Sequence, residues 1–405
     1  MDGLVNDASG EQAPLHYSLI STPESFQKTL DSLIPAPRLA IDIEADSLYH
    51  YFEKVCLIQI STDADTYILD PLAIENIGDL ALVMANDAAE KVFHAAGYDV
   101  YCLRRDYGFS FSNIFDTHCA GQLLGYEFLG LGALMEKLLG IHHSKRRQRD
   151  DWSRRPLESA QLEYAAMDTH HLLQLRDALE GELRKKGRLE WAKEEFEATA
   201  NTERPSKEFD SEGFRRIKGN RDLPPEDQLV LRALYIFRDQ AARKLDVPPF
   251  KVINNSTLLD LTKNPPKSIR EMFGRSGISR RVARKFSADI MDTIDEARGQ
   301  DPSILEPLAR NNWKPFSRES KHRLEKLKLW RRKKARELEL QVGVVFPANL
   351  LENLADDPPT DLEGFAAFPA MRQWRVREFG GEILRLLRNQ NSQIEISAGI
   401  SHQLP

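Results

Sequence analysis

Two carboxylates one residue apart, Asp42 and Glu44, end the apolar stretch 38–44 (RLAIDIE). On a β-strand alternate side chains share a face, so both acids would point the same way while Ile43 points to the opposite layer. Carboxylates held this close raise each other's pKa, and a bound divalent cation removes that cost. A solvent-facing strand end would need no ion, so the pair by itself indicates a cation site without requiring one.

Two further acids have a spacing that could bring them to the same place. Asp99 follows a short strand and the small residues 95–97, which predicts a position in the first turn of a helix, where the helix dipole favours an anion. Tyr164 and Asp168 are four residues apart and would share one helical face. The small residues 165–166 between them would let that helix approach a sheet closely. Taken singly, capping explains Asp99 and a structural pair explains Tyr164 and Asp168.

The first half of the chain must supply the elements that position these residues. Short β-branched-rich stretches predict strands, and longer periodic stretches predict helices. Strands are expected at 38–44, 55–60, 66–69 and about 91–94, and helices near 75–85, 98–106, 117–124, 131–139 and 157–180. Three meandering strands followed by alternating helix and strand predict an α/β domain with a mixed sheet flanked by helices.

The second half is helical in pattern and contains an internal repeat. Phe237-Arg238 recurs as Trp330-Arg331, 93 positions later, and Pro265-Pro266 recurs as Pro358-Pro359 at the same ungapped offset. Eight identities at one offset are not a chance match. The chain therefore carries two copies of one helical module, expected at 223–300 and 321–395. A polar stretch at 201–222 and another at 301–320 are predicted linkers, and 396–405 is a predicted tail.

Composition narrows the class of protein. The 405 residues are 41% hydrophobic with a formal net charge of −6, as expected of a globular protein with two or three domains. No run approaches the roughly 18 apolar residues that cross a bilayer, which excludes a membrane protein. The N-terminal stretch does not resemble a signal peptide, and the three cysteines have no paired spacing. A cytoplasmic protein with reduced thiols is expected.

The acids and the tyrosine together form a known constellation. An Asp-x-Glu pair on a first strand, an Asp opening a helix and a late Tyr-x3-Asp resemble the DEDDy 3′-5′ exonucleases and, within them, the ribonuclease D family. The amino-acid sequence around them also resembles that family, at 57–60 (LIQI), 115–117 (FDT) and 151–157 (DWSRRPL). The resemblance covers nearly all of 20–190. The repeated modules look like helicase-and-RNase-D C-terminal (HRDC) domains, the second copy being more divergent.

This resemblance implies a fold, a cofactor and a reaction. The nuclease domain, expected at 1–200, would be a ribonuclease H-like mixed sheet followed by two small all-α HRDC-like domains. Two divalent ions, Mg²⁺ or Mn²⁺, would be held by Asp42, Glu44, Asp99 and Asp168, with Tyr164 orienting the attacking water. The expected substrate is RNA with a single-stranded 3′ end, in particular transfer-RNA precursors, cut to 5′-monophosphates by a monomeric enzyme.

Residues outside this constellation could bind RNA. Trp152 could stack on a base, although a large aromatic among basic residues is more often a packing anchor. Arg154 and Arg155, in the basic cluster 142–155, could contact phosphates. Arg331 and Arg332 belong to 321–336, which carries nine Lys/Arg and is the expected backbone-binding surface outside the nuclease. Asp116 is expected to cap a helix.

Three other functions compete with this one. A DNA-acting 3′-5′ exonuclease would share the catalytic constellation, which cannot separate the two substrates. A nucleic-acid-binding scaffold with a dead nuclease site would be expected to lack at least one of the carboxylates, and all four are present. A small-molecule hydrolase would leave the two helical modules unexplained.

Overall fold

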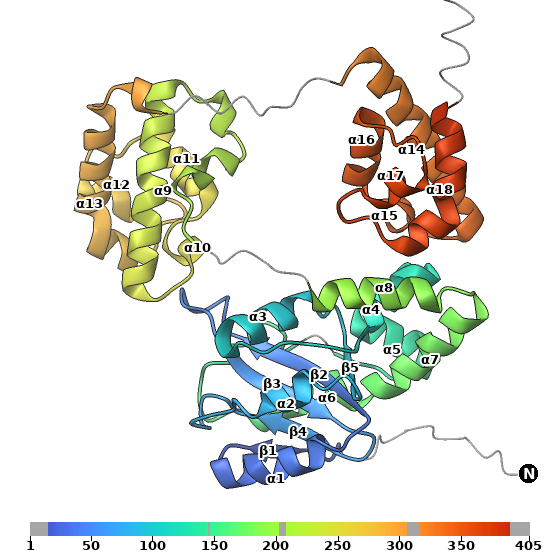
Figure 1. Cartoon of the computed structure of the whole chain (residues 1–405). Helices are drawn as coiled ribbons and strands as arrows, with labels where there is room; N and C mark the ends of the chain where they lie inside the picture. Colours follow the sequence, from blue (N-terminus) through green and yellow to red (C-terminus); the bar gives the residue numbers. More distant parts are fainter. Residues whose placement is uncertain (1–14, 145, 202–207, 306–315, 389–405) are drawn as a thin grey trace, which may run out of the picture.

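The computed structural model describes residues 15–144, 146–201, 208–305 and 316–388 (Figure 1). An α/β domain at the N-terminal end of the chain is followed by two helical modules, one coloured yellow-green to orange and the other orange to red in Figure 1. This is the predicted fold class. Among the residues described, no helix is both long and apolar enough to cross a membrane.

The α/β domain is built on a mixed sheet of six strands in the order β1-β4-β3-β2-β5-β6. Neighbours β2–β3 and β3–β4 are antiparallel, whereas β1–β4, β2–β5 and β5–β6 are parallel. The strands are β1 (Ser18–Ile20), β2 (Arg38–Ala45), β3 (Val55–Ser61), β4 (Thr66–Leu69), β5 (Glu90–Phe93) and β6 (Ile114–Asp116). The four predicted strands are confirmed. The two edge strands were not predicted, because three residues are too few to show a period of two.

Helices cover both faces of the sheet. Alternate β2 side chains Leu39, Ile41 and Ile43 belong to the core shared with α1, α2 and α3, while Ala40 belongs to the core formed with α4, α5, α7 and α8. Asp42 and Glu44 lie in phase with Ala40, on the face that α6 and α7 cover. The helices are α1 (Pro23–Leu33), α2 (Leu80–Met84), α3 (Gly97–Tyr107), α4 (Thr117–Leu124), α5 (Leu131–Leu139), α6 (Ser159–His170), α7 (Leu172–Lys185) and α8 (Leu189–Ala200).

Two of the predicted helices differ from the observed ones. The stretch 157–180 is divided at His171 into α6 and α7, and of 75–85 only 80–84 is α-helical. The chain turns at His171 with φ −104° and ψ 5°, outside the helical region. Helix α6 is thereby free to lie against β2, β3 and β4 while α7 continues toward β5.

The two helical modules repeat element by element. Five helices of the first, α9 (Pro225–Leu245), α10 (Pro249–Val252), α11 (Asn255–Lys263), α12 (Ile269–Phe273) and α13 (Arg280–Arg298), begin 93 residues before α14 (Arg318–Leu338), α15 (Val342–Val345), α16 (Ala348–Asp356), α17 (Leu362–Ala366) and α18 (Gln373–Arg388). The long first helix ends at a left-handed residue in both copies, Asp246 and Glu339. The predicted repeat is therefore structural.

The predicted linkers contain ordered structure where they are described. Two short 3₁₀ helices, η1 (Ser211–Arg216) and η2 (Asn220–Asp222), lie within the predicted linker 201–222, and buried Phe214 joins the core of the first module. Helix α14 begins at Arg318, inside the predicted linker 301–320. The linker parts 202–207 and 306–315 and the predicted tail 396–405 lie outside the described residues.

The second module shares its core with the α/β domain. The indole rings of Trp191 in α8 and Trp374 in α18 stack with their centroids 4.5 Å apart. Glu195 accepts hydrogen bonds from Trp374 Nε1 (3.0 Å) and Arg375 (2.6 Å). The first module instead has its own core, against which Tyr51 of the α/β domain packs, and Asp246 contacts His50 Nδ1 at 2.8 Å.

Candidate active site

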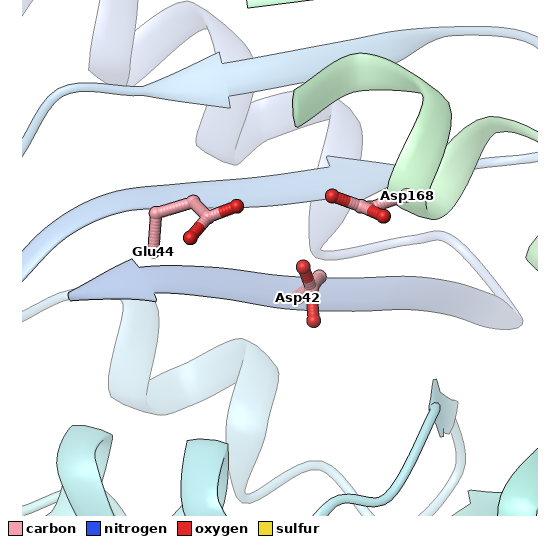
Figure 2. A group of neighbouring side chains, drawn as sticks. All are labelled: Asp42, Glu44 and Asp168. Atoms are coloured by element: carbon pink, nitrogen blue, oxygen red, sulfur yellow. The ribbon is translucent and has the colours of Figure 1, made fainter. Parts of the chain in front are cut away.

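Three carboxylates converge where α6 crosses the sheet. Asp42 and Glu44 project from β2 and Asp168 from α6, and one oxygen of each lies within 4.8 Å of the others (Figure 2). The strand alternation predicted for β2 is what turns the first two acids to the same side. Ala165 and Ala166, both fully buried on α6, let the helix carrying Asp168 approach the strands closely.

Asp99 completes the set from the first turn of α3. It lies outside the group of three, yet its side chain is only 6% exposed and its Oδ2 has no hydrogen-bond partner within the described part of the chain. The turn before α3 is held by Asp116, whose carboxylate accepts from the backbone N–H groups of Ala95 and Ala96, each at 3.0 Å. Asp116 also caps α4 through the N–H of His118, so its predicted capping role is confirmed.

The four acids destabilise each other as anions. Burial, followed by the charges of Asp99, Asp168 and Glu44, raises the pKa of Asp42 well above its ordinary value. Burial and the charges of Asp168 and Asp99 do the same to the pKa of Glu44. The pKa of Asp99 is raised by burial and then by Asp116 and Asp168.

This donor set fits divalent cations. Carboxylate oxygens are the hard ligands that Mg²⁺ and Mn²⁺ prefer, and a cation would remove the mutual repulsion and give Asp99 Oδ2 a partner. The geometry brings three of the predicted ligands within 4.8 Å of one another, and Asp99 lies near enough for its charge to raise the pKa of Asp42. Their assignment as metal ligands stays a prediction.

Tyr164 lies one helical turn from Asp168, as predicted. Burial, followed by the charges of Asp168 and Glu44, raises the pKa of its phenol far above the ordinary value of 10. The hydroxyl therefore stays protonated at neutral pH. It can donate a hydrogen bond and orient a water molecule, but it cannot act as a base.

Two polar residues of the site had no predicted role. His143 Nε2 donates to Asp168 Oδ1 at 2.7 Å, and the signal was hidden because the histidine lies in a stretch dominated by arginines. Gln59 pairs in register with Asp42 on β3 and is fully buried, and neither polar atom of its amide has a hydrogen-bond partner within the described ranges. Strand pairing, once known, would have pointed to Gln59, because paired residues share a face.

Two of the predicted RNA-binding residues of the nuclease domain make structural contacts. Trp152 is only 1% exposed and packs with Ala165 and Ala166, so it offers no ring face to a base. Arg155 forms a bidentate pair with Asp70, at 2.6 and 2.7 Å, which occupies its guanidinium. The burial of Trp152 contradicts the predicted base stacking, whereas the phosphate contact predicted for Arg155, whose side chain is 29% exposed, stays a prediction. Arg154 is exposed and stays a prediction.

The two arginines on α14 that were predicted to bind RNA, Arg331 and Arg332, differ in their contacts and exposure. Arg331 donates to the carbonyl of Phe346 at 2.8 Å, and its repeat equivalent Arg238 donates to the carbonyl of Ile253 at 3.1 Å. Both arginines therefore hold the end of the following short helix, and the RNA-binding role predicted for Arg331 stays a prediction. Arg332 is exposed and stays a prediction.

Family models match three parts of the chain. Residues 17–184 match a 3′-5′ exonuclease family, and residues 227–294 and 320–387 each match the HRDC domain. All four acids and Tyr164 lie within the first match, and the two HRDC matches coincide with the two repeated modules.

Relatives and solved structures agree with these matches. A ribonuclease D from Nitrobacter hamburgensis is 28% identical over 92% of this chain and 95% of its own length. The catalytic core of RRP6 from Trypanosoma brucei (mutant C496S) is 27% identical with a TM-score of 0.65, covering 71% of this chain and 82% of that one. Escherichia coli RNase D shares the fold over 92% of this chain and 99% of its own, at 20% identity and a TM-score of 0.66. Over nearly its whole length the chain is therefore similar to curated ribonuclease D proteins, with a 3′-5′ exonuclease domain followed by two HRDC domains.

Proposed function

We propose that this protein removes nucleotides one at a time from single-stranded 3′ ends of RNA and releases nucleoside 5′-monophosphates. The observation that carries the proposal is the convergence of Asp42, Glu44 and Asp168 in a largely buried cluster, where burial and neighbouring acids, Asp99 included, raise the pKa values of Asp42 and Glu44.

Each residue of the cluster has one task in this scheme. Asp42, Glu44, Asp99 and Asp168 would hold two divalent ions, Mg²⁺ or Mn²⁺. When bound, such ions activate a water molecule and stabilise the leaving 3′ oxygen. Tyr164, a protonated phenol, donates a hydrogen bond that orients the attacking water.

The substrate class is inferred from the relatives, whose names include ribonuclease D and the exosome exonuclease RRP6. Transfer-RNA precursors are the substrates we propose, handled by a monomer in the cytoplasm. The free thiols of Cys56, Cys102 and Cys119 are in keeping with a reducing compartment. We divide the chain as expected from its sequence, into a nuclease domain at 1–200 and HRDC domains at 223–300 and 321–395.

Arg332 is the residue of the basic helix that we propose contacts the phosphate backbone. It lines a hollow of about 740 Å³ between α14 and residues 125–127 of the nuclease domain, together with Arg336. Charge reversal, Arg332→Glu, should weaken RNA binding and reduce its salt dependence by about one counterion. Arg331→Lys, which alters a structural contact, is the matched comparison, and an unchanged salt dependence in Arg332→Glu would remove this part of the proposal.

The experiment is a time course on 5′-labelled single-stranded RNA and the matching DNA, with Mg²⁺, Mn²⁺ or EDTA. Asp42→Ala is run beside the wild type. A metal-dependent ladder that shortens from the 3′ end of RNA, and that is absent in the variant, is the expected result.

The other outcomes separate the alternatives. Equal or faster shortening of DNA would make the protein a DNA-acting exonuclease of the same superfamily. Binding without degradation of either substrate would favour a catalytically dead scaffold. Equal activity of Asp42→Ala and wild type at matched metal would overturn the assignment of the carboxylates.

A further inference from the structure

His143 reaches the carboxylate cluster on the segment between α5 and α6. Helix α5 ends at Gly140, in the left-handed conformation with φ 69°. The chain then returns across Gly132 of the same helix, where an added Cβ would lie 2.9 Å from the carbonyl oxygen of His143. A glycine at 132 is therefore what allows the backbone of His143 to pass so close to α5.

The imidazole forms a buried contact with one predicted metal ligand. His143 Nε2 donates to Asp168 Oδ1 at 2.7 Å, and the two side chains are only 5% and 8% exposed. A carboxylate offers two oxygens and about four lone pairs, so one hydrogen bond leaves the other oxygen of Asp168 available. Hydrogen bonds of this kind fix the orientation of ligands at metal sites.

The same ring confines Tyr164. The His143 and Tyr164 rings are stacked, with centroids 5.5 Å apart and planes 26° from parallel. The ring centroid of Trp152, which is also buried, lies 6.0 Å from that of Tyr164. Because Tyr164 and Asp168 are one helical turn apart, one histidine contacts both of them.

We propose that His143 is a positioning residue for the exonuclease reaction. It sets the orientation of Asp168 for the ion and holds the Tyr164 ring at the angle from which its hydroxyl reaches the attacking water. The role rests on the proposed function, since it concerns the same site. It assigns to the segment after α5 a task that the four carboxylates and the tyrosine do not cover.

The test measures Mn²⁺ binding directly, by electron paramagnetic resonance of the free ion, without RNA. His143→Ala should raise the dissociation constant for Mn²⁺ by about 10- to 100-fold, the usual effect of losing an outer partner of a metal ligand. His143→Gln keeps a side-chain N–H donor and should restore most of the affinity. His142→Ala is the matched control, because the His142 side chain is 78% exposed and its Nδ1 contacts Glu136, which lies outside the carboxylate cluster.

Single-turnover cleavage at saturating Mn²⁺ then tests the contact with Tyr164. The rate of His143→Ala should stay below wild type even when the site is full, since the phenol is no longer confined. Wild-type Mn²⁺ affinity together with a wild-type single-turnover rate would overturn the proposal.

Two further comparisons distinguish a failure of this proposal from a folding defect and from a failure of the proposed function. If His143→Ala does not fold, Gly132→Ala decides, because its Cβ displaces the segment while the imidazole is retained. Unchanged Mn²⁺ affinity in a folded Gly132→Ala would then count against the role. If the wild type binds Mn²⁺ more tightly than His143→Ala but degrades no RNA, the proposed function fails and the positioning of Asp168 stands.

Discussion

Buried carboxylates occur in two regions of this molecule with opposite surroundings. In the nuclease site, burial and neighbouring acids raise the pKa values of Asp42 and Glu44. At the contact with the second HRDC domain, burial would likewise raise the pKa of Glu195, but Arg375, the hydrogen bond from Trp374 and Arg372 hold it below its ordinary value. The difference lies in the compensating charge, which Arg375 and Arg372 supply at Glu195 and which a divalent ion would supply at Asp42 in the proposed function.

The largest effect should follow from removing one charge in the site. Asp42→Asn keeps the shape of the side chain but loses a predicted ligand, so the exonuclease rate should fall by about 10³-fold, the equivalent of several kcal/mol of lost metal-ion stabilisation. The stability of the metal-free protein should not fall, because the variant removes a charge that burial and neighbouring acids disfavour. The measurements are single-turnover cleavage in Mn²⁺ and urea unfolding in EDTA.

Glu195→Gln should show the opposite pattern. Arg375, whose side chain is 7% exposed, would lose its buried partner, and breaking such a pair costs about 3 kcal/mol of unfolding free energy. The cleavage rate per folded molecule should stay at the wild-type level. Urea unfolding checks the first expectation. Arg372→Gln is the milder control, since this more exposed pair is worth under about 1 kcal/mol. Equal stability of Glu195→Gln and wild type would break the comparison.

Divalent ions should stabilise one region and leave the other unchanged. At a concentration about 100-fold above its dissociation constant, Mn²⁺ should raise the unfolding free energy by about 2.7 kcal/mol. Asp42→Asn should lose most of this gain, whereas Glu195→Gln should keep it in full. Thermal melts with and without Mn²⁺ compare the three proteins, and an equal gain in all of them would place the ion elsewhere.

The dependence of stability on pH should also differ in sign. A carboxyl group whose pKa is raised by folding favours the folded state at low pH, and that contribution is lost as the pH rises through the raised value. In EDTA the wild type should therefore lose stability relative to Asp42→Asn as the pH rises above 3.8, by up to about 1.4 kcal/mol per unit. Glu195 stabilises above 4.5, and this contribution is lost as the pH falls through its lowered pKa. Melting temperatures across this range, in EDTA, test both slopes.

The arrangement of the carboxylate cluster could be predicted because its residues recur at short, regular spacings along the sequence. The alternation around Asp42 and Glu44 and the helical spacing of Tyr164 and Asp168 both translate directly into shared faces. His143 could not be predicted, because its contact with Asp168 depends on the path of an irregular segment across Gly132.

The same contrast holds for the fold. Elements that are set by local sequence patterns could be predicted, whereas contacts between elements could not. The strands and helices with clear periods and the repeat of 93 residues were readable from the sequence. The contacts of Trp152, Arg155 and Arg331 were not. Their partners belong to other elements: Asp70 is 85 residues from Arg155, and the Phe346 carbonyl is 15 residues from Arg331. Composition alone cannot distinguish a solvated arginine from one that holds a carbonyl or a distant carboxylate.

The stacking of Trp191 on Trp374 has a consequence for how the chain folds while the ribosome synthesises it. The face of α8 that carries Trp191 packs against residues made about 180 positions later, which takes about 10–40 s at ordinary rates of synthesis. During that interval the nuclease sheet can form, but an apolar face with a tryptophan at its centre has nothing to cover it. The second HRDC domain is thus the one that covers this face of the nuclease domain.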